Sequence, residues 1–181
     1  MLPIKVNDYF LLLLGVGAAA SSVVMIKASS ISPIYMAALR LIISAIILSP
    51  LFFTHKKREQ LKLGLLFRES WLPALALSVH FILWIHGARM IPAANATLVV
   101  NMMPVFMPFT IFLMFRESVT PREIGATLLA MAGLVIVSMR GLSLSMDNLS
   151  GNALCFGSML FLTVYLAIGK IKRTSKNLWL Y

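Results

Sequence analysis

The sequence predicts an all-α polytopic membrane protein with six transmembrane helices. Of its 181 residues, 60% are hydrophobic and only 12% are charged, about half the charged fraction of a soluble domain. The apolar residues gather in long blocks, and the basic residues lie between these blocks. The net charge of +10 would also suit a nucleic-acid-binding protein, but the chain has no basic face and no basic patch interleaved with aromatic residues. We therefore expect no nucleic acid as a partner.

Six segments have about the 20 apolar residues that roughly 30 Å of hydrocarbon requires. They cover residues 9–26, 33–53, 71–90, 94–115, 122–139 and 151–169. The first segment follows Lys5 and ends before Lys27. This length favours a spanning helix over the shorter apolar core of a cleaved signal peptide.

Local signals indicate where two of these helices begin. Ser32 can cap the second helix, with Pro33 at its first helical position. Thr120, Pro121 and Glu123 have the spacing of a capping box that opens the fifth. Both helices are therefore predicted to begin at a proline.

Small residues recur at four-residue spacing, as at Ala126 and Ala130 and again at Gly151 and Cys155. This spacing lets helices approach closely in lipid, so it predicts packing rather than a particular function. Cys155 is the single cysteine, which excludes a disulfide within the chain.

The basic residues predict the orientation of the chain. With the N-terminus in the cytoplasm, three Lys and Arg residues lie outside: Lys27, Arg89 and Arg140. Twelve lie inside: Lys5, Lys56, Lys57, Arg58, Lys62, Arg68, Arg116, Arg122, Lys170, Lys172, Arg173 and Lys176. This bias predicts a multi-pass protein of the cell (inner) membrane with both ends of the chain in the cytoplasm.

The sixteenth basic residue, Arg40, lies inside the second span, where a charge is costly. Apart from the cap residue Glu123, no Asp or Glu lies within the six predicted spans. Arg40 can extend its guanidinium toward the interface or pair with a helix-end carbonyl. The alternative is that it faces a water-filled cavity or an anionic group of a substrate.

The third span carries His80 and Trp84 one turn apart on the same face. His80 is the titratable group nearest the middle of the membrane, which makes it the candidate if protons drive transport. A structural hydrogen-bond donor is the alternative. His86 faces another side of the helix, so the sequence predicts no metal site made by the two histidines.

The fourth span places Thr97, Asn101, Pro104 and Pro108 along one stripe. Each proline removes a helical hydrogen bond, and the freed carbonyls are tolerated only against protein or a wet cavity. The stripe therefore indicates either a cavity wall or a purely structural kink. Trp84, Tyr35 and Phe81 could also stack on an aromatic or adenine ring of a ligand, and packing between helices is the alternative.

These segments resemble one family in their order and spacing. MIKASSISPIYMAALRLIISA, which contains Arg40, resembles the end of the first helix and the start of the second in EamA-type transporters of the drug/metabolite transporter superfamily. GARMIPAANATLVVNMMPVFMPFTIFLMFRESVTPREIGATLLAMAGLVIV, with Pro104 in its fourth helix, resembles the third-to-fifth helix region. GNALCFGSMLFLTVYLAIGKI resembles the opening helix of the family's second repeat.

The resemblance implies ten helices in two inverted five-helix repeats, with a substrate cavity between them. Residues 1–142 would form the first repeat and residues 143–181 the start of the second, since the sequence ends at LWLY, where the seventh helix would begin. The implied function is export or exchange of a small metabolite (an amino acid, nucleobase, nucleoside or similar) by alternating access. The residues expected to bind the substrate are Arg40, His80, Trp84, Thr97, Asn101 and Tyr35, with Pro104 and Pro108 in the cavity wall.

The expected partners are a small-molecule substrate, the lipid bilayer and either a second five-helix repeat or a second copy. No cofactor is expected. The alternative function is a truncated or half-size protein without autonomous transport, acting as a scaffold or as one half of a dimer. An enzyme is disfavoured, because a nucleophilic Ser158 would need His80 as its base and an acid to orient it.

Overall fold

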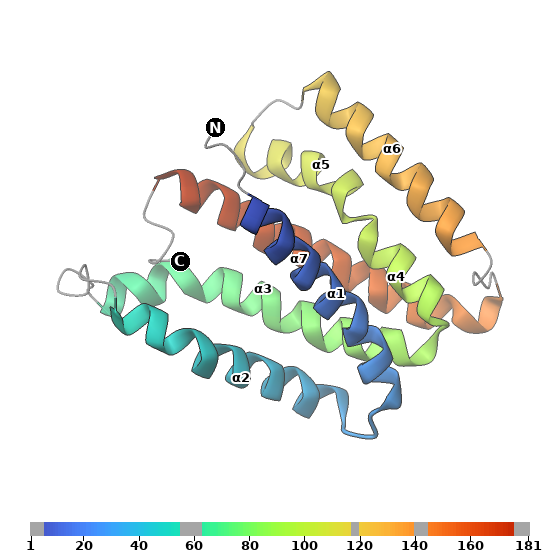
Figure 1. The fold of residues 1–181 in the computed structure, drawn as a ribbon, viewed down its shortest axis with the longest axis horizontal. Helices are drawn as coiled ribbons and strands as arrows, with labels where there is room; N and C mark the ends of the chain where they lie inside the picture. The colour runs from blue at the N-terminus through green and yellow to red at the C-terminus, as the bar shows by residue number, and fades with distance from the viewer. Residues whose placement is uncertain (1–5, 55–62, 117–119, 140–144, 176–181) are drawn as a thin grey trace. The chain divides into compact units, whose positions relative to one another are not determined.

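The computed structural model describes residues 6–54, 63–116, 120–139 and 145–175, and every element in them is helical (Figure 1). The elements are α1 (Val6–Ala28), α2 (Pro33–Thr54), α3 (Leu63–Met90), α4 (Ala93–Asn101), α5 (Met103–Phe115), α6 (Pro121–Ser138), the short 3-10 helix η3 (Met146–Asn148) and α7 (Leu149–Ser175). The predicted all-α membrane class is confirmed. Lys5, Arg140, Lys176 and the basic residues of the segment 55–62 lie outside the described residues.

Five stretches of the described helices are long and apolar enough to cross a membrane. They are Tyr9–Ala28, Pro33–Pro50, Ser70–Met90, Ala93–Phe115 and Met146–Lys170. α6 occupies the residues of the predicted fifth span but is not among these five. A crossing by α6 therefore stays a prediction.

The predicted helix starts agree with the capping geometry. α2 begins at Pro33, and the Met36 N–H donates to the Ser32 carbonyl at 3.0 Å. At the start of α6, Thr120 Oγ1 accepts from the Glu123 N–H at 3.3 Å, while Glu123 Oε2 accepts from the Thr120 N–H at 2.8 Å. These reciprocal bonds satisfy two backbone donors that have no partner within the helix.

The predicted fourth span, residues 94–115, agrees with the apolar stretch Ala93–Phe115, and this stretch is divided into two helices. α4 ends at Asn101 and α5 begins at Met103, with the single residue Met102 between them. Pro104 has no N–H, so the helical hydrogen bond to the Val100 carbonyl is missing. The next N–H, that of Val105, donates to the Met102 carbonyl at 2.9 Å, three residues back rather than four. Pro104 therefore starts a new helix rather than bending a continuous one.

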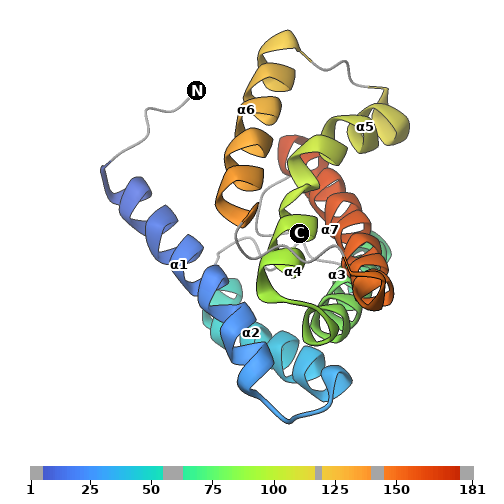
Figure 2. The same cartoon turned by 90° about the vertical axis from the view of Figure 1, so that its right-hand side faces the viewer.

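The contacts divide the chain into two compact units, Met1–Ser30 and Ile31–Tyr181. The first unit is the helix α1. In the second, α3 and α7 make the most extensive contact, α2 packs on α3, α4 and α5 pack on α7, and α6 packs on α4 and α5 (Figures 1 and 2). The pair α3 and α7 thus forms the centre of the second unit.

Small residues let α3 and α7 approach closely. A Cβ atom at Gly87 would lie 2.8 Å from Cys155 Sγ and 2.9 Å from the Gly151 carbonyl oxygen. A Cβ atom at Gly151 would collide with Ile91 and would lie 2.9 Å from Met90 Cβ. We call this contact between the two helices the α3–α7 seam. Gly87 of α3 faces Gly151 of α7, and His80 faces Ser158, so the two helices are antiparallel.

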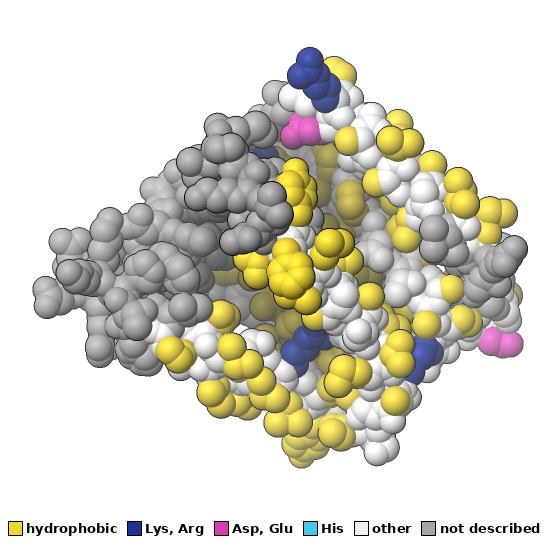
Figure 3. Space-filling model, viewed as in Figure 1, with side chains coloured by type: hydrophobic (Ala, Val, Ile, Leu, Met, Phe, Trp, Pro, Cys, Tyr) yellow, Lys and Arg dark blue, Asp and Glu magenta, His cyan; other side chains and the backbone are white. Residues whose placement is uncertain are grey.

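The outer helices of the second unit present hydrophobic side chains (Figure 3). On α6, Leu128, Leu129 and Ile136 are all exposed, and on α2 the same holds for Ile43 and Ile47. Such a surface suits contact with lipid chains.

Candidate functional site

A buried polar pair joins α3 and α7 at the seam. His80 is 5% exposed and Ser158 is fully buried. His80 Nδ1 lies 3.0 Å from the Ser158 carbonyl oxygen and 2.8 Å from Ser158 Oγ. In return, the Ser158 hydroxyl donates to the His80 carbonyl at 3.1 Å.

These contacts favour one tautomer of His80. A carbonyl oxygen can only accept, so the tautomer with the proton on Nδ1 satisfies both contacts with Ser158. In the neutral ring, Nε2 is then the nitrogen that can accept a proton or a hydrogen bond. The pair satisfies polar groups that would otherwise be unpaired in a low-dielectric interior.

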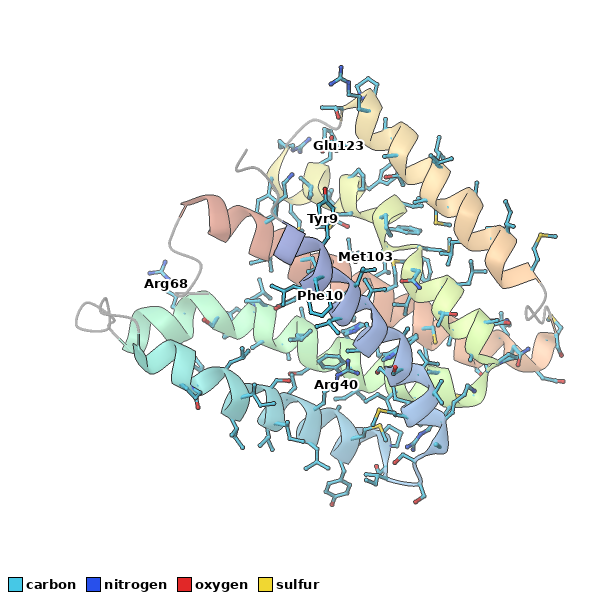
Figure 4. All side chains as sticks on the ribbon, viewed as in Figure 1. Tyr9, Phe10, Arg40, Arg68, Met103 and Glu123 are labelled. Carbon is cyan, nitrogen blue, oxygen red and sulfur yellow. The ribbon has the colours of Figure 1, made fainter. Side chains whose placement is uncertain are left out.

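Arg40 lies beside this pair, on α2. Figure 4 shows Arg40 on this helix. Its side chain is half-buried, and Cζ stands 4.6 Å from the centroid of the Phe81 ring. The Phe81 ring in turn lies 5.0 Å from the His80 ring, tilted by 50°. A guanidinium over an aromatic face is attracted by the ring quadrupole, and the attraction strengthens where water is excluded. α2, α3 and α7 thus meet at a row of side chains: Arg40, Phe81, His80 and Ser158.

The structure brings some of the other predicted residues to this row and leaves others apart. Trp84 is buried on α3, one turn beyond His80. Tyr35, in the first turn of α2, has an exposed side chain. Thr97, in α4, donates its hydroxyl to the carbonyls of its own helix, Ala93 at 2.7 Å and Ala94 at 3.0 Å. Asn101 is exposed at the end of α4.

Pro104 and Pro108 border a different space. They line a cavity of about 480 Å³ between α5, α6 and the last turns of α7. Thr97 and Asn101 are not among the residues that line it, since the interruption at Met102 splits the predicted stripe. Among the described residues, no group of three His, Cys, Asp or Glu side chains could hold a metal ion.

The model of the EamA-like transporter family matches residues 7–139, which is more than half of the chain. The chain belongs to the EamA-like transporter family. Its general function is therefore that of a membrane transporter. No curated protein and no solved structure matches the chain. The family match ends close to the boundary at residue 142 expected for the first repeat, and that division stays a prediction.

In this EamA-like transporter, the contact between Ser158 and His80 does not have the geometry of a hydrolase. The Ser158 hydroxyl donates to a carbonyl rather than to the histidine ring, and Ser158 is fully buried. A catalytic serine must reach its substrate and give its proton to the base. The pair is therefore arranged to hold two helices together.

Sequence reasoning missed two further polar residues of the transporter. Asn95 is 4% exposed within α4, and the amide oxygen of Asn152, on α7, is buried without a hydrogen-bond partner in the described part of the chain. An amide inside an apolar helix was the available signal in both cases, because burying it without a partner is unfavourable.

Proposed function

We propose that this EamA-like transporter exports or exchanges a small metabolite across the cell membrane by alternating access, and that Arg40 binds an anionic or electron-rich group of the substrate. Amino acids carry a carboxylate, and nucleobases and nucleosides carry ring carbonyl oxygens. A guanidinium can bind either kind of group with two parallel hydrogen bonds.

The position of Arg40 is the observation that supports this proposal best. Its charge lies within an apolar helix and rests on the face of Phe81, inside the unit rather than at a helix end. Ionisable residues at such positions mark substrate or ion pathways by default, because their burial is unfavourable. The contact with the ring does not neutralise the guanidinium, so Arg40 keeps its positive charge inside the unit.

The other proposed substrate contacts take roles that their surroundings allow. Tyr35 and Asn101 are exposed, so both can meet a substrate without any rearrangement. The Thr97 hydroxyl already donates its proton to the Ala93 carbonyl, so toward a substrate it can only accept a hydrogen bond. His80 and Trp84 are buried, so in this proposal they contact substrate only in a conformation in which α2 and α3 separate.

We propose the cell (inner) membrane as the location, with both ends of the chain in the cytoplasm. The bias of twelve basic residues inside against three outside supports this orientation. The bilayer is the proposed neighbour of the exposed apolar faces. A second five-helix repeat or a second copy of the chain is the proposed partner across the substrate cavity.

Efflux assays test the role of Arg40. Bacterial cells that express the 181-residue chain are loaded with radiolabelled amino acids or nucleosides, and loss of label is compared with that of host cells. We expect Arg40→Ala to abolish the additional efflux. Arg40→Lys should slow it by about tenfold, because a lysine cannot form the paired hydrogen bonds.

Arg89→Ala is the matched control, since Arg89 is an arginine in the last turn of α3. It should leave efflux close to that of the wild type. Normal efflux by Arg40→Ala at equal membrane expression would remove Arg40 from the substrate site. Absence of any additional efflux by the wild-type chain would contradict transport of these compounds.

A further inference from the structure

The cavity beside α5 is apolar along most of its length. One face of α5 lines it, through Met103, Pro104, Met107, Pro108 and Ile111. From Met103 to Ile111 the helix rises about 12 Å, at 1.5 Å per residue. Ala126 lines the cavity from α6. The volume of about 480 Å³ lies within the range of small-ligand sites.

Opposite charges gather at one end of this cavity. Glu123 in the first turn of α6, its N-cap Thr120 and Lys170 near the end of α7 also line the cavity. Thr127 of α6 is the remaining lining residue. Figure 4 shows Glu123 at the start of α6 and Met103 far from it, at the start of α5. The charged groups therefore lie at one end of the cavity, which we call its mouth, and apart from Thr127 the rest of the lining is apolar.

Thr120 holds the Glu123 carboxylate in place. Glu123 Oε2 accepts from the backbone N–H and the hydroxyl of Thr120, each at 2.8 Å, which leaves Oε1 as an acceptor for a ligand. Lys170 acts electrostatically on the same carboxylate. A carboxylate and an ammonium at one mouth match a ligand that carries one positive and one negative group.

We propose that this cavity binds a phospholipid of the phosphatidylethanolamine type. The primary ammonium of the headgroup meets Glu123, the phosphate meets Lys170, and an acyl chain lies along Met103, Met107 and Ile111. This site is separate from the row at Arg40, and the proposal does not depend on which metabolite is transported.

Two features favour a lipid over a soluble zwitterion. The apolar face of α5 continues about 12 Å inward from the mouth, farther than the side chain of an amino acid extends. The charges also lie where the apolar part of α6 begins and where that of α7 ends, which is the depth of lipid headgroups. An acyl chain fills such a space with favourable dispersion contacts.

Native mass spectrometry of the full chain in detergent measures the retained lipid. Equal amounts of dioleoyl phosphatidylethanolamine, phosphatidylcholine and phosphatidylglycerol are added. We expect about tenfold more retained ethanolamine lipid than choline lipid, since a quaternary ammonium cannot donate a hydrogen bond to Glu123. Glu123→Gln should abolish this preference while keeping the capping box, because glutamine also serves there.

Arg122→Gln is the matched control, because Arg122 is a neighbouring charge in the first turn of α6 that does not line the cavity. It should retain lipid like the wild type. Ala126→Phe, which fills the cavity, should reduce retention of all three lipids, whereas Ala132→Phe, on another face of α6, should not. The two phenylalanine variants are compared at equal yields of folded protein, so that a difference in retained lipid reflects the cavity and not misfolding.

Two outcomes would overturn the proposal. One is equal retention of ethanolamine lipid by the wild type and by Glu123→Gln. The other is displacement of the lipid by soluble phosphoethanolamine or leucine at millimolar concentration, which would assign the cavity to a soluble zwitterion. Neither outcome bears on the efflux expected from Arg40.

Discussion

Two helix pairs of the unit Ile31–Tyr181 pack in opposite ways. At the α3–α7 seam, a Cβ atom added to Gly87 or Gly151 would have no room. Between α5 and α6, cavities of about 480 and 470 Å³ lie among the described side chains. Because lipid is as apolar as leucine, close packing of helices in a membrane depends on small residues and on polar contacts across the interface.

The comparison shows that a glycine allows close packing only where another helix faces it. Gly125 and Gly133 of α6 have no atom of another element within 4 Å of an added Cβ. In contrast, Gly87 of α3 faces Cys155 of α7, and Gly151 of α7 faces Ile91, the residue that follows α3. The seam also has the hydrogen bonds between His80 and Ser158, whereas the second α5–α6 cavity is lined almost entirely by apolar side chains.

The largest effect is expected from Gly151→Leu. The new side chain would collide with Ile91 Cγ2 and with Met90 Cβ, and Met90 Cβ cannot move without moving the α3 backbone. We expect loss of the folded chain, measured as monodisperse protein by size-exclusion chromatography in detergent. Gly133→Leu, which has open space around it, should be recovered like the wild type. Equal recovery of the two variants would contradict the close approach of α3 and α7.

Two methionine-to-alanine variants test how well the α3–α7 seam and the α5–α6 region are packed. Met159 is fully buried at the seam, so Met159→Ala should lower the free energy of unfolding by about 2–5 kcal/mol. Met107 already borders a cavity, and Met107→Ala should lower it by less than about 1 kcal/mol. Thermal unfolding can be followed with a thiol-reactive dye, because the single cysteine, Cys155, is buried in the seam. Similar losses for both variants would show that the two regions pack equally well.

The smallest effect is expected from Ser158→Ala. This change removes the hydroxyl that donates to the His80 carbonyl, but the Ser158 carbonyl still accepts from His80 Nδ1. Hydrogen bonds between membrane helices contribute about 0.6 kcal/mol on average and up to about 1.7, so we expect a loss in that range by the same dye assay. Ser78→Ala should have no measurable effect, because Ser78 bonds only to Ala74 of its own helix. A loss as large for Ser78→Ala would assign the effect to loss of a serine hydroxyl from any helix rather than to the seam.

Much of the fold could be predicted because hydrophobic length and caps are local properties. Pro33 and Pro121 begin their helices as predicted. The predicted span 71–90 agrees with the stretch Ser70–Met90, while the helix α3 itself begins at Leu63, in a short apolar segment before Arg68 and Glu69. The break at Met102 was indicated by Pro104, but residue spacing alone could not distinguish a bend from a new helix.

The candidate site could be predicted only residue by residue. Composition singled out Arg40 and His80, since each is polar within an apolar run. The contact of His80 with Ser158 depends on the register of α3 against α7, which is set by packing between segments 78 positions apart. Likewise, nothing local to Arg40 indicates that Phe81 of another helix lies under its guanidinium.

Met102, the residue between α4 and α5, has a structural consequence. The Met102 N–H still donates to the carbonyls of Leu98 and Val99, while Pro104 removes the bond to Val100. The apolar stretch Ala93–Phe115 can thereby change direction at one residue and still pack on α7 with both of its parts.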